Sequence, residues 1–182
     1  LTGLGNALRI AVVNPKGSIY QAEYLDILRQ MSDEVFLLPG VDRVQMKSLW
    51  TPSTRWIGIT EQGLDGGPVI PDDYDGSPAS LDQLKNNVAR SGQIGQLIAV
   101  DGQSTIIYMP LLGEASTGEP LDYAKYSDLL ENLRAKYQDK GVEIHITGFT
   151  KVMGDLIEGV EAVLSFFALA VLIATGMVYW YT

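Results

Sequence analysis

The acidic residues between Pro71 and Asp82 are the first candidates for chemistry in this 182-residue chain. Asp73, Asp75, Gly76 and Asp82 fall at four positions of the pattern by which loops between helices bind calcium through side-chain oxygens. The first ligand position of that pattern is Pro71, which has no side-chain oxygen. We therefore expect a solvated acidic loop here, and no metal site.

The residues that serve in enzymes are sparse. His145 is the only histidine and lies between Glu143 and Thr147 on the outward side of an alternating run, while the chain has no cysteine. A catalytic triad or a zinc site needs partners that this histidine lacks. The segment Gly3 to Gly5 resembles the start of a dinucleotide fingerprint, but it precedes a strand and Leu8 stands at the third glycine position. The sequence therefore predicts neither a catalytic residue nor a cofactor, and we expect no enzyme.

Two tryptophans are weak candidates for contact with a ligand. Trp50 and Trp56 flank the turn at Pro52, where their rings could line a site for a hydrophobic or amphiphilic small molecule. The alternative is that both rings pack an inserted segment onto the rest of the domain, and the pattern favours this packing role.

An apolar run at the C-terminal end decides the class of the protein. Ala162 to Thr182 contains 21 residues without a charge, and a helix of this length spans about 30 Å, the thickness of the hydrocarbon core of a bilayer. The run closes on aromatic rings of the kind that settle at the headgroups. We predict a membrane helix anchored by Phe166, Phe167, Leu169, Leu172, Tyr179, Trp180 and Tyr181. The alternative, a buried central helix, needs apolar cover that a domain of about 160 residues seldom supplies.

The residues just before this run carry a polar and an apolar face. Asp155, Glu158 and Glu161 recur at helical spacing and predict a solvent-facing stem that continues into the membrane helix. A proton path through them is a weaker alternative, because relay acids normally lie within the apolar span.

The charge distribution limits the partners. All 13 basic and all 22 acidic residues lie at or before Glu161, so the net charge of −9 belongs to a solvated part. No cluster of Lys or Arg is present, which excludes nucleic acid as the expected partner. The absence of cysteine excludes disulfides. Because the chain opens at Leu1 without a signal peptide, we expect it to be a fragment.

Strands and helices alternate along the solvated part. The sequence predicts a strand at Leu8–Asn14, a helix with an apolar stripe from Tyr20 to Val35 and a capping box at Ser18 and Gln21, and a half-exposed strand at Val41–Trp50 with Val44, Met46 and Leu49 inward. Farther along it predicts a hairpin of Gln96–Val100 and Thr105–Leu112 joined by Asp101-Gly102, a helix from Tyr123 to Tyr137 that stops at Gly141, and a strand at Val142–Gly148.

Residues 52–92 differ in composition from these units. The segment from Pro52 to Pro78, both ends included, holds five Gly and four Pro, with Arg55 as the only base. We expect an irregular but ordered surface crossing in which Trp56, Ile57 and Ile59 dock on the domain. A short helix should follow, with a second capping box at Ser80 and Gln83 and a stop at Ser91-Gly92.

Two β-α-β units thus bracket an acidic, Gly/Pro-rich insertion. This order predicts an α+β fold, a ferredoxin-like split β-α-β sandwich with helices on one face of a mainly antiparallel sheet, followed by one transmembrane helix. We divide the chain into a solvated domain at 1–149, with its insertion at 52–92, and a helical stem with the membrane helix at 150–182.

The order of these features and two segments resemble a transporter family. RWIGITEQGLDGGPVIP at 55–71 and GFTKVMGDLIEG at 148–159 are similar to the first periplasmic domain and second transmembrane helix of resistance-nodulation-division (RND) exporters, closest to the MMPL-type branch of predicted RND exporters. The resemblance implies a porter domain of a polytopic, proton-driven exporter of hydrophobic or amphiphilic compounds, including lipids. The proton-relay acids of the family sit on a later helix, so none is assigned here.

The resemblance also implies a place in the cell and a set of partners. It puts the chain in the bacterial inner membrane with residues 1–161 on the periplasmic side. Its partners would be the bilayer, the remaining transmembrane and periplasmic parts of the same transporter, the transported small molecules and, in a homo-oligomer, further copies. Two other functions stay open at this point: a ligand-binding or adaptor ectodomain of a single-pass membrane protein, and a membrane-tethered hydrolase.

Overall fold

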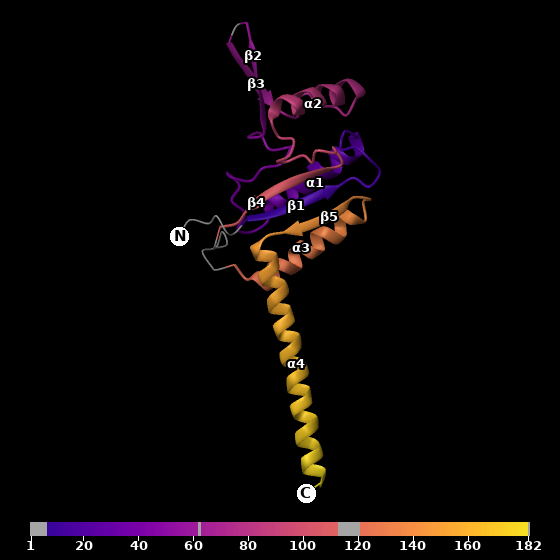
Figure 1. Ribbon diagram of the computed structural model, residues 1–182, viewed down its shortest axis with the longest axis vertical. Coiled ribbons are helices and arrows are strands. Elements are labelled where there is room, and N and C mark those ends of the chain that lie inside the picture. Colours follow the sequence, from indigo (N-terminus) through magenta and orange to yellow (C-terminus); the bar gives the residue numbers. More distant parts are fainter. Residues whose placement is uncertain (1–6, 62, 113–120, 182) are drawn as a thin grey trace.

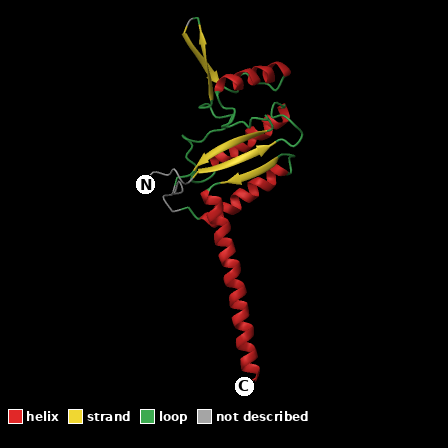
Figure 2. Ribbon diagram, in the orientation of Figure 1, coloured by secondary structure: helices red, strands yellow, loops and turns green. Residues whose placement is uncertain are grey.

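The computed structural model describes residues 7–61, 63–112 and 121–181, which form four helices and five strands (Figure 1). In chain order these are β1 Ala7–Val13, α1 Ala22–Leu37, β2 Arg55–Thr60, β3 Gly63–Pro68, α2 Pro78–Ser91, β4 Ser104–Pro110, α3 Tyr123–Gln138, β5 Glu143–Thr147 and α4 Phe149–Tyr181. Most of them gather in one body, from which α4 extends toward the C-terminus (Figure 2). The opening segment with Gly3 and residues 113–120 lie outside the described residues.

The main sheet has three strands in the order β4-β1-β5, and each neighbouring pair is antiparallel. On one face of β1 the side chains of Leu8, Ile10 and Val12 are fully buried. They belong to one apolar cluster with Leu28 of α1 and Leu130 of α3, so both helices cover the same face of the sheet. The α+β fold class is thus confirmed, as are the helices predicted near residues 20–35 and 123–137.

Both predicted capping boxes are wrong. The helix α1 begins one residue after Gln21, whose side chain makes no capping hydrogen bond, and the Ser18 hydroxyl instead accepts from the backbone N–H of Tyr20 at 3.2 Å. The cap of α2 is Ser77, whose Oγ accepts from the backbone N–H of Ser80 at 3.3 Å. A proline follows this serine in the first helical turn, where its missing N–H costs nothing.

The segment 41–50 is a turn, where the sequence predicted a strand. The Asp42 carboxylate accepts from the backbone N–H of Val44 at 3.1 Å, and the Asp42 carbonyl accepts from the N–H of Met46 at 2.9 Å. This local bonding points Val44 into solvent, at 89% exposure, while Met46 is buried as expected. A bridge at Lys47 still joins the segment to β4.

The hairpin at Asp101-Gly102 is present, but its first arm is not a strand. The backbone N–H of Ala99 bonds to Ser104 at 3.0 Å, and the carbonyl of Leu97 accepts from Ile106 at 2.8 Å. Regular pairing stops there because the N–H groups of residues 96, 97 and 98 all turn back to the Gln93 carbonyl.

The insertion contains a second sheet, β2 paired with β3, where we expected irregular chain. Glycine permits this pairing, since a Cβ on Gly66 would lie 2.7 Å from the Trp56 carbonyl oxygen. The hairpin projects from the body at the end opposite to α4 (Figure 1). The predicted docking of Ile57 and Ile59 is wrong, because their side chains are 67% and 89% exposed. The register places Ile59 opposite Leu64, which is also exposed.

The main sheet and α4 are joined by a single residue, Gly148, between Thr147 and Phe149. Its φ of +144° suits glycine, and a Cβ there would lie 2.6 Å from the Ala7 carbonyl oxygen and 3.0 Å from Leu8 Cα. The start of α4 lies beside α3 and touches β1 and β5. The helix α4 therefore leaves the domain directly, without a flexible linker.

Candidate ligand groove and membrane helix

The final helix presents an apolar surface that the rest of the described chain leaves uncovered. Val163–Tyr181 is long and apolar enough to cross a membrane, and none of this stretch is buried. The seven residues predicted to anchor it are between 53% and 95% exposed. Apolar surface of this extent needs lipid or protein around it. The stem side chains of Asp155, Glu158 and Glu161 lie outside the described part of the chain, so the predicted polar face stays a prediction.

The indole of Trp50 is fixed between α1 and the insertion. Its Nε1–H donates to the Leu25 carbonyl at 3.0 Å. Its ring meets the ring of Tyr74 edge to face, with centroids 5.6 Å apart. The Arg29 guanidinium lies over the indole, 5.3 Å from its centroid. The three side chains thus form one aromatic and cationic cluster on the outer side of α1.

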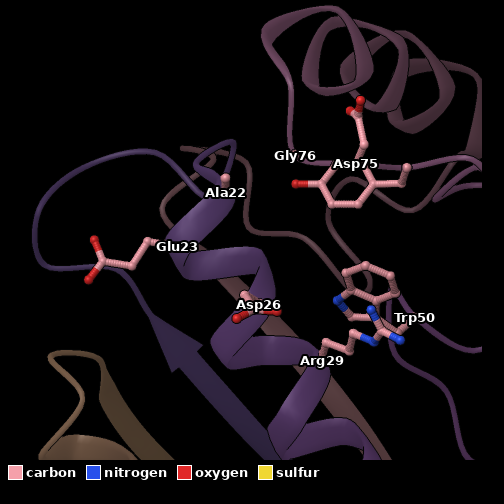
Figure 3. A pocket seen from close by; sticks show the side chains of 8 residues that line it. Ala22, Glu23, Asp26, Arg29, Trp50, Asp75 and Gly76 are labelled. Carbon is pink, nitrogen blue, oxygen red and sulfur yellow. The ribbon is translucent and has the colours of Figure 1, made fainter.

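Two hollows adjoin this cluster, and together we call them the α1 groove. The first has a volume of about 370 Å³ and is lined by Ala22, Glu23, Asp26, Arg29, Trp50, Tyr74, Asp75 and Gly76 (Figure 3). The second has a volume of about 540 Å³ and is lined by Arg29, Asp33, Leu49, Trp50, Thr51, Pro52, Arg55, Pro68, Ile70, Pro71, Asp72 and Tyr74. The groove therefore runs along α1, with the insertion as its opposite wall and the Trp50 cluster at its middle.

The charges of the two ends differ. Three carboxylates, of Glu23, Asp26 and Asp75, and one guanidinium line the first hollow. Hydrogen bonds from the side chain and backbone N–H of Ser77 lower the pKa of Asp75 to about 2, so this carboxylate stays charged. Burial, with the nearby charges of Asp26 and Asp75, raises the pKa of the Tyr74 hydroxyl, which therefore stays protonated. The second hollow has two carboxylates and two guanidiniums and is balanced.

Trp56 has a different role from Trp50. It does not line either hollow of the groove, and the Arg90 guanidinium of α2 lies 5.5 Å from its ring centroid. On the hairpin it approaches Gly67, where a Cβ would lie 3.2 Å from the indole Nε1. Trp56 thus packs the hairpin against α2, while Trp50 lies at the groove where a ligand contact is geometrically available.

His145 lies on the outward face of β5, as its alternating sequence predicted. Its side chain is 64% exposed, and its Nε2 is 4.0 Å from a carboxylate oxygen of Glu143. Among the described residues, no group of three or more His, Asp or Glu side chains is arranged to hold a metal ion. The polar side chains that line the groove are carboxylates, guanidiniums, the Trp50 indole and the hydroxyls of Tyr74 and Thr51, and the Thr51 hydroxyl donates to the Ser48 carbonyl at 2.8 Å.

Sequence reasoning found Trp50 but missed the residues that accompany it. Glu23, Asp26, Arg29 and Asp33 are spaced by three or four residues on the exposed face of α1. That spacing signals a polar helix face, and most such faces meet only solvent. What makes it one wall of a groove is the return of residues 68–76 across the domain, which local patterns do not report.

Comparison with known proteins adds no relative: no protein-family model matches the chain, and no curated protein matches its sequence.

Proposed function

We propose that the chain is the periplasmic part of a proton-driven RND-type exporter of hydrophobic or amphiphilic compounds, held on the inner membrane by α4, and that it acts without catalysis of its own. The observation that carries the proposal is the direct junction of sheet and helix at Gly148. A domain fixed to a spanning helix in this way moves as one body with it. Such a body suits a transporter, in which membrane events must reach an external domain.

The fold supports the proposed porter type in its strand arrangement. The order β5-β1-β4, with the segment at Lys47 bridged to the outer edge of β4, corresponds to a ferredoxin-like sandwich whose second strand is reduced to a turn. Both long helices lie on one face of the sheet, as that architecture requires. We assign the chain to this split β-α-β type on these grounds and on the resemblance at 55–71 and 148–159.

The α1 groove favours a second candidate, a ligand-binding or adaptor ectodomain of a single-pass membrane protein. Such a protein needs only one spanning helix and one ligand site, and α4 and the groove would supply them. The two candidates differ in the whole gene product. An exporter requires several further apolar spans and an energy source, whereas an anchored ectodomain requires neither.

Topology and transport test the proposal separately. Because these 182 residues contain no cysteine, Ala79→Cys offers a single label on the exposed start of α2, in a full-length gene product from which any cysteine outside this chain has been removed. We expect a membrane-impermeant maleimide to label it in spheroplasts and not in inverted vesicles. Labelling in inverted vesicles alone would refute the periplasmic orientation.

Transport is measured in a strain that lacks its own pumps. Expression of the full-length gene should lower the accumulation of a hydrophobic dye, and a proton uncoupler should abolish that difference. Accumulation that the uncoupler leaves unchanged would contradict a proton-driven exporter and favour the anchored ectodomain.

A further inference from the structure

The hairpin of β2 and β3 carries an aspartate whose side chain lies against the backbone nitrogen of the next residue. The Gly66 N–H donates to the Asp65 carboxylate at 2.8 Å, and both residues are exposed. We propose that Asp65-Gly66 is a site of spontaneous covalent modification, at which the peptide bond migrates to the side chain and leaves an isoaspartate in β3. The modification requires neither a ligand nor transport, so it is tested independently of the proposed function.

The chemistry needs only these two residues and water. The Gly66 nitrogen attacks the carboxyl carbon Cγ of Asp65 in its protonated form, a new N–Cγ bond forms, and the C–OH bond breaks. The hydroxyl leaves as water with the proton that the nitrogen loses, which gives a five-membered succinimide. Water then adds to the former backbone carbonyl carbon and breaks its bond to nitrogen. The product has its backbone running through Cγ and a free carboxylate at the former backbone carbonyl, whereas addition of water at Cγ restores aspartate.

The nitrogen of Gly66 lies outside the pairing between the two strands. Neighbouring pairs of an antiparallel ladder alternate between pairs that exchange two hydrogen bonds and pairs that exchange none. Pro68, opposite Arg55, has no N–H and belongs to the second kind. Gly66, two residues earlier and opposite Ile57, belongs to it as well. Because β2 is the one described strand that pairs with β3, the Gly66 N–H faces the open edge, where the Asp65 carboxylate meets it.

The surroundings of the pair favour closure of the ring. Gly66 has no side chain that would obstruct the approach of its nitrogen to Cγ of Asp65. A hairpin of two strands is only marginally stable in water, and the side chains of Ile59 and Leu64 beside the site are 89% and 80% exposed. Few buried contacts therefore resist local opening, which supplies the backbone rotation that the attack requires.

The sequence contains two further Asp-Gly pairs, and neither has this geometry. In both, the carboxylate accepts from the N–H two residues farther on, at 2.9 Å for Asp75 and 3.0 Å for Asp101. Hydrogen bonds from the side chain and backbone of Ser77 also lower the pKa of Asp75 to about 2, so this carboxylate stays charged and resists attack. The nitrogen of Gly102 donates to the Ala99 carbonyl at 2.9 Å. Of the three pairs, only the one in the hairpin places its nitrogen against its own carboxylate.

The modification changes the pairing of the hairpin. An isoaspartate lengthens the backbone by one methylene group between residues 65 and 66, which displaces the partners on the two sides of that point relative to each other. Gly67 pairs with Trp56, and a Cβ on Gly67 would lie 3.2 Å from the indole Nε1, so this contact leaves little room for a shift. Because the hairpin projects from the body, the main sheet should stay intact (Figure 1).

The test compares the three sites within one protein, the full chain in detergent micelles. After prolonged incubation in mildly acidic buffer, electron-transfer mass spectrometry of the peptides measures isoaspartate at each site. We expect Asp65 to convert about tenfold or more faster than Asp75 and Asp101 in the folded chain, because misalignment of reacting atoms costs up to about a hundredfold in rate. In urea the three rates should converge. Equal rates in the folded chain, or a slower rate at Asp65, would overturn the proposal.

Variants separate the geometry from the dipeptide sequence. Asp65→Asn forms the same succinimide with ammonia as the leaving group, so it should convert faster than the parent. Asp65→Glu keeps the charge but needs a six-membered ring, and it should abolish conversion at this position. The matched control is Asp101→Asn, whose glycine nitrogen already donates to a carbonyl. Conversion of Asp101→Asn as fast as that of Asp65→Asn would mean that the dipeptide alone decides the rate, which contradicts the proposal.

The converted protein tests the structural consequence. Its amide hydrogen exchange should be faster across β2 and β3 than in the unconverted protein, and unchanged across β1. Unchanged exchange in the hairpin would refute the loss of pairing. Faster exchange in β1 as well would mean that conversion accompanies global unfolding, and it would refute the assignment of the reaction to the folded hairpin.

Discussion

Tyr24 offers the sharpest test of the core, because its hydroxyl connects α1 to two strands of the main sheet. It donates to the Val12 carbonyl at 2.8 Å and lies 2.7 Å from Thr105 Oγ1. The carbonyl has no proton, so the tyrosine proton goes to Val12 and the threonine hydroxyl donates to the tyrosine oxygen. Both residues are almost fully buried.

The cost of deleting this hydroxyl follows from those two bonds. Each neutral buried hydrogen bond contributes about 1 kcal/mol net, so Tyr24→Phe should lower the free energy of unfolding by about 2 kcal/mol. Thr105→Val removes only one of the two and should cost about 1 kcal/mol. In the double variant that shared bond is lost only once, so the sum should fall short of additivity by about 1 kcal/mol.

Urea unfolding of the full chain in mild detergent, followed by tryptophan fluorescence, measures these differences. A loss below about 0.5 kcal/mol for Tyr24→Phe, or strictly additive effects in the double variant, would refute the hydrogen-bond reasoning. The pH adds an independent check. Burial raises the pKa of Tyr24 above its ordinary value of 10.0, so its contribution is complete below pH 10 and is lost as the pH rises further. Tyr24→Phe should therefore make stability less sensitive to alkaline pH.

Three further variants probe other parts of the chain. Gly148→Ala should lower the free energy of unfolding, measured by thermal unfolding, by about 2 kcal/mol or more, because Gly148 has a positive φ and an added Cβ would clash with β1. The control Gly159→Ala should not destabilise the protein, because a Cβ there meets nothing within 4 Å. Equal effects of the two substitutions would refute the tight junction between the sheet and α4. Glu34→Gln should lower the free energy of unfolding by about 0.5 to 1 kcal/mol at pH 7. Burial raises the pKa of the Glu34 carboxyl, but the hydrogen bonds from Lys136 and Tyr137 of α3 outweigh it, so the pKa is lowered and the stabilisation is lost as the pH falls below about 4.5. A difference in stability between the two proteins that persists at pH 3 would contradict this reasoning. Trp56→Ala should speed amide hydrogen exchange across β2 and β3 without lowering the global stability, because Trp56 packs the hairpin against α2. The exposed Ile57 is the control, and Ile57→Ala should leave the exchange rates unchanged. Unchanged exchange in both variants would contradict the packing role of Trp56.

Much of the main sheet was predictable from local pattern, for a physical reason. The fully buried Leu8, Ile10 and Val12 alternate with half-buried or exposed positions, as in an antiparallel sheet with one face on the core. The stripes of α1 and α3 follow the same logic at helical spacing. The apolar stretch of α4 needs only composition and length to be found.

The errors occur where side chains bond to nearby backbone or where glycine removes the usual signal. Asp42 turns the chain at a point where hydropathy alone suggested a strand. The strand β3 holds Gly63, Gly66 and Gly67, a composition typical of loops, and forms because its partner strand packs closely against it. Exposed apolar residues such as Ile59 also defeat the expectation that they dock.

The groove could be predicted only in part, because it depends on distant segments. The ring of Trp50 meets Tyr74, 24 positions later, and α1 lies across from both. No spacing rule links these segments. The charged residues on α1 look like an ordinary solvated face, because nothing in their spacing reports that the insertion lies opposite them.

The arrangement of the elements constrains how a ligand would reach the groove. From the C-terminal end of α4, Figure 1 shows α4, then α3 with β5, then α1, and last the hairpin of β2 and β3. The α1 groove, with Trp50 at its middle, thus lies on the side of the body that faces away from α4. A lipid embedded beside α4 does not touch it. Any ligand of the groove must therefore arrive through water or from a neighbouring domain, and not from the surroundings of α4.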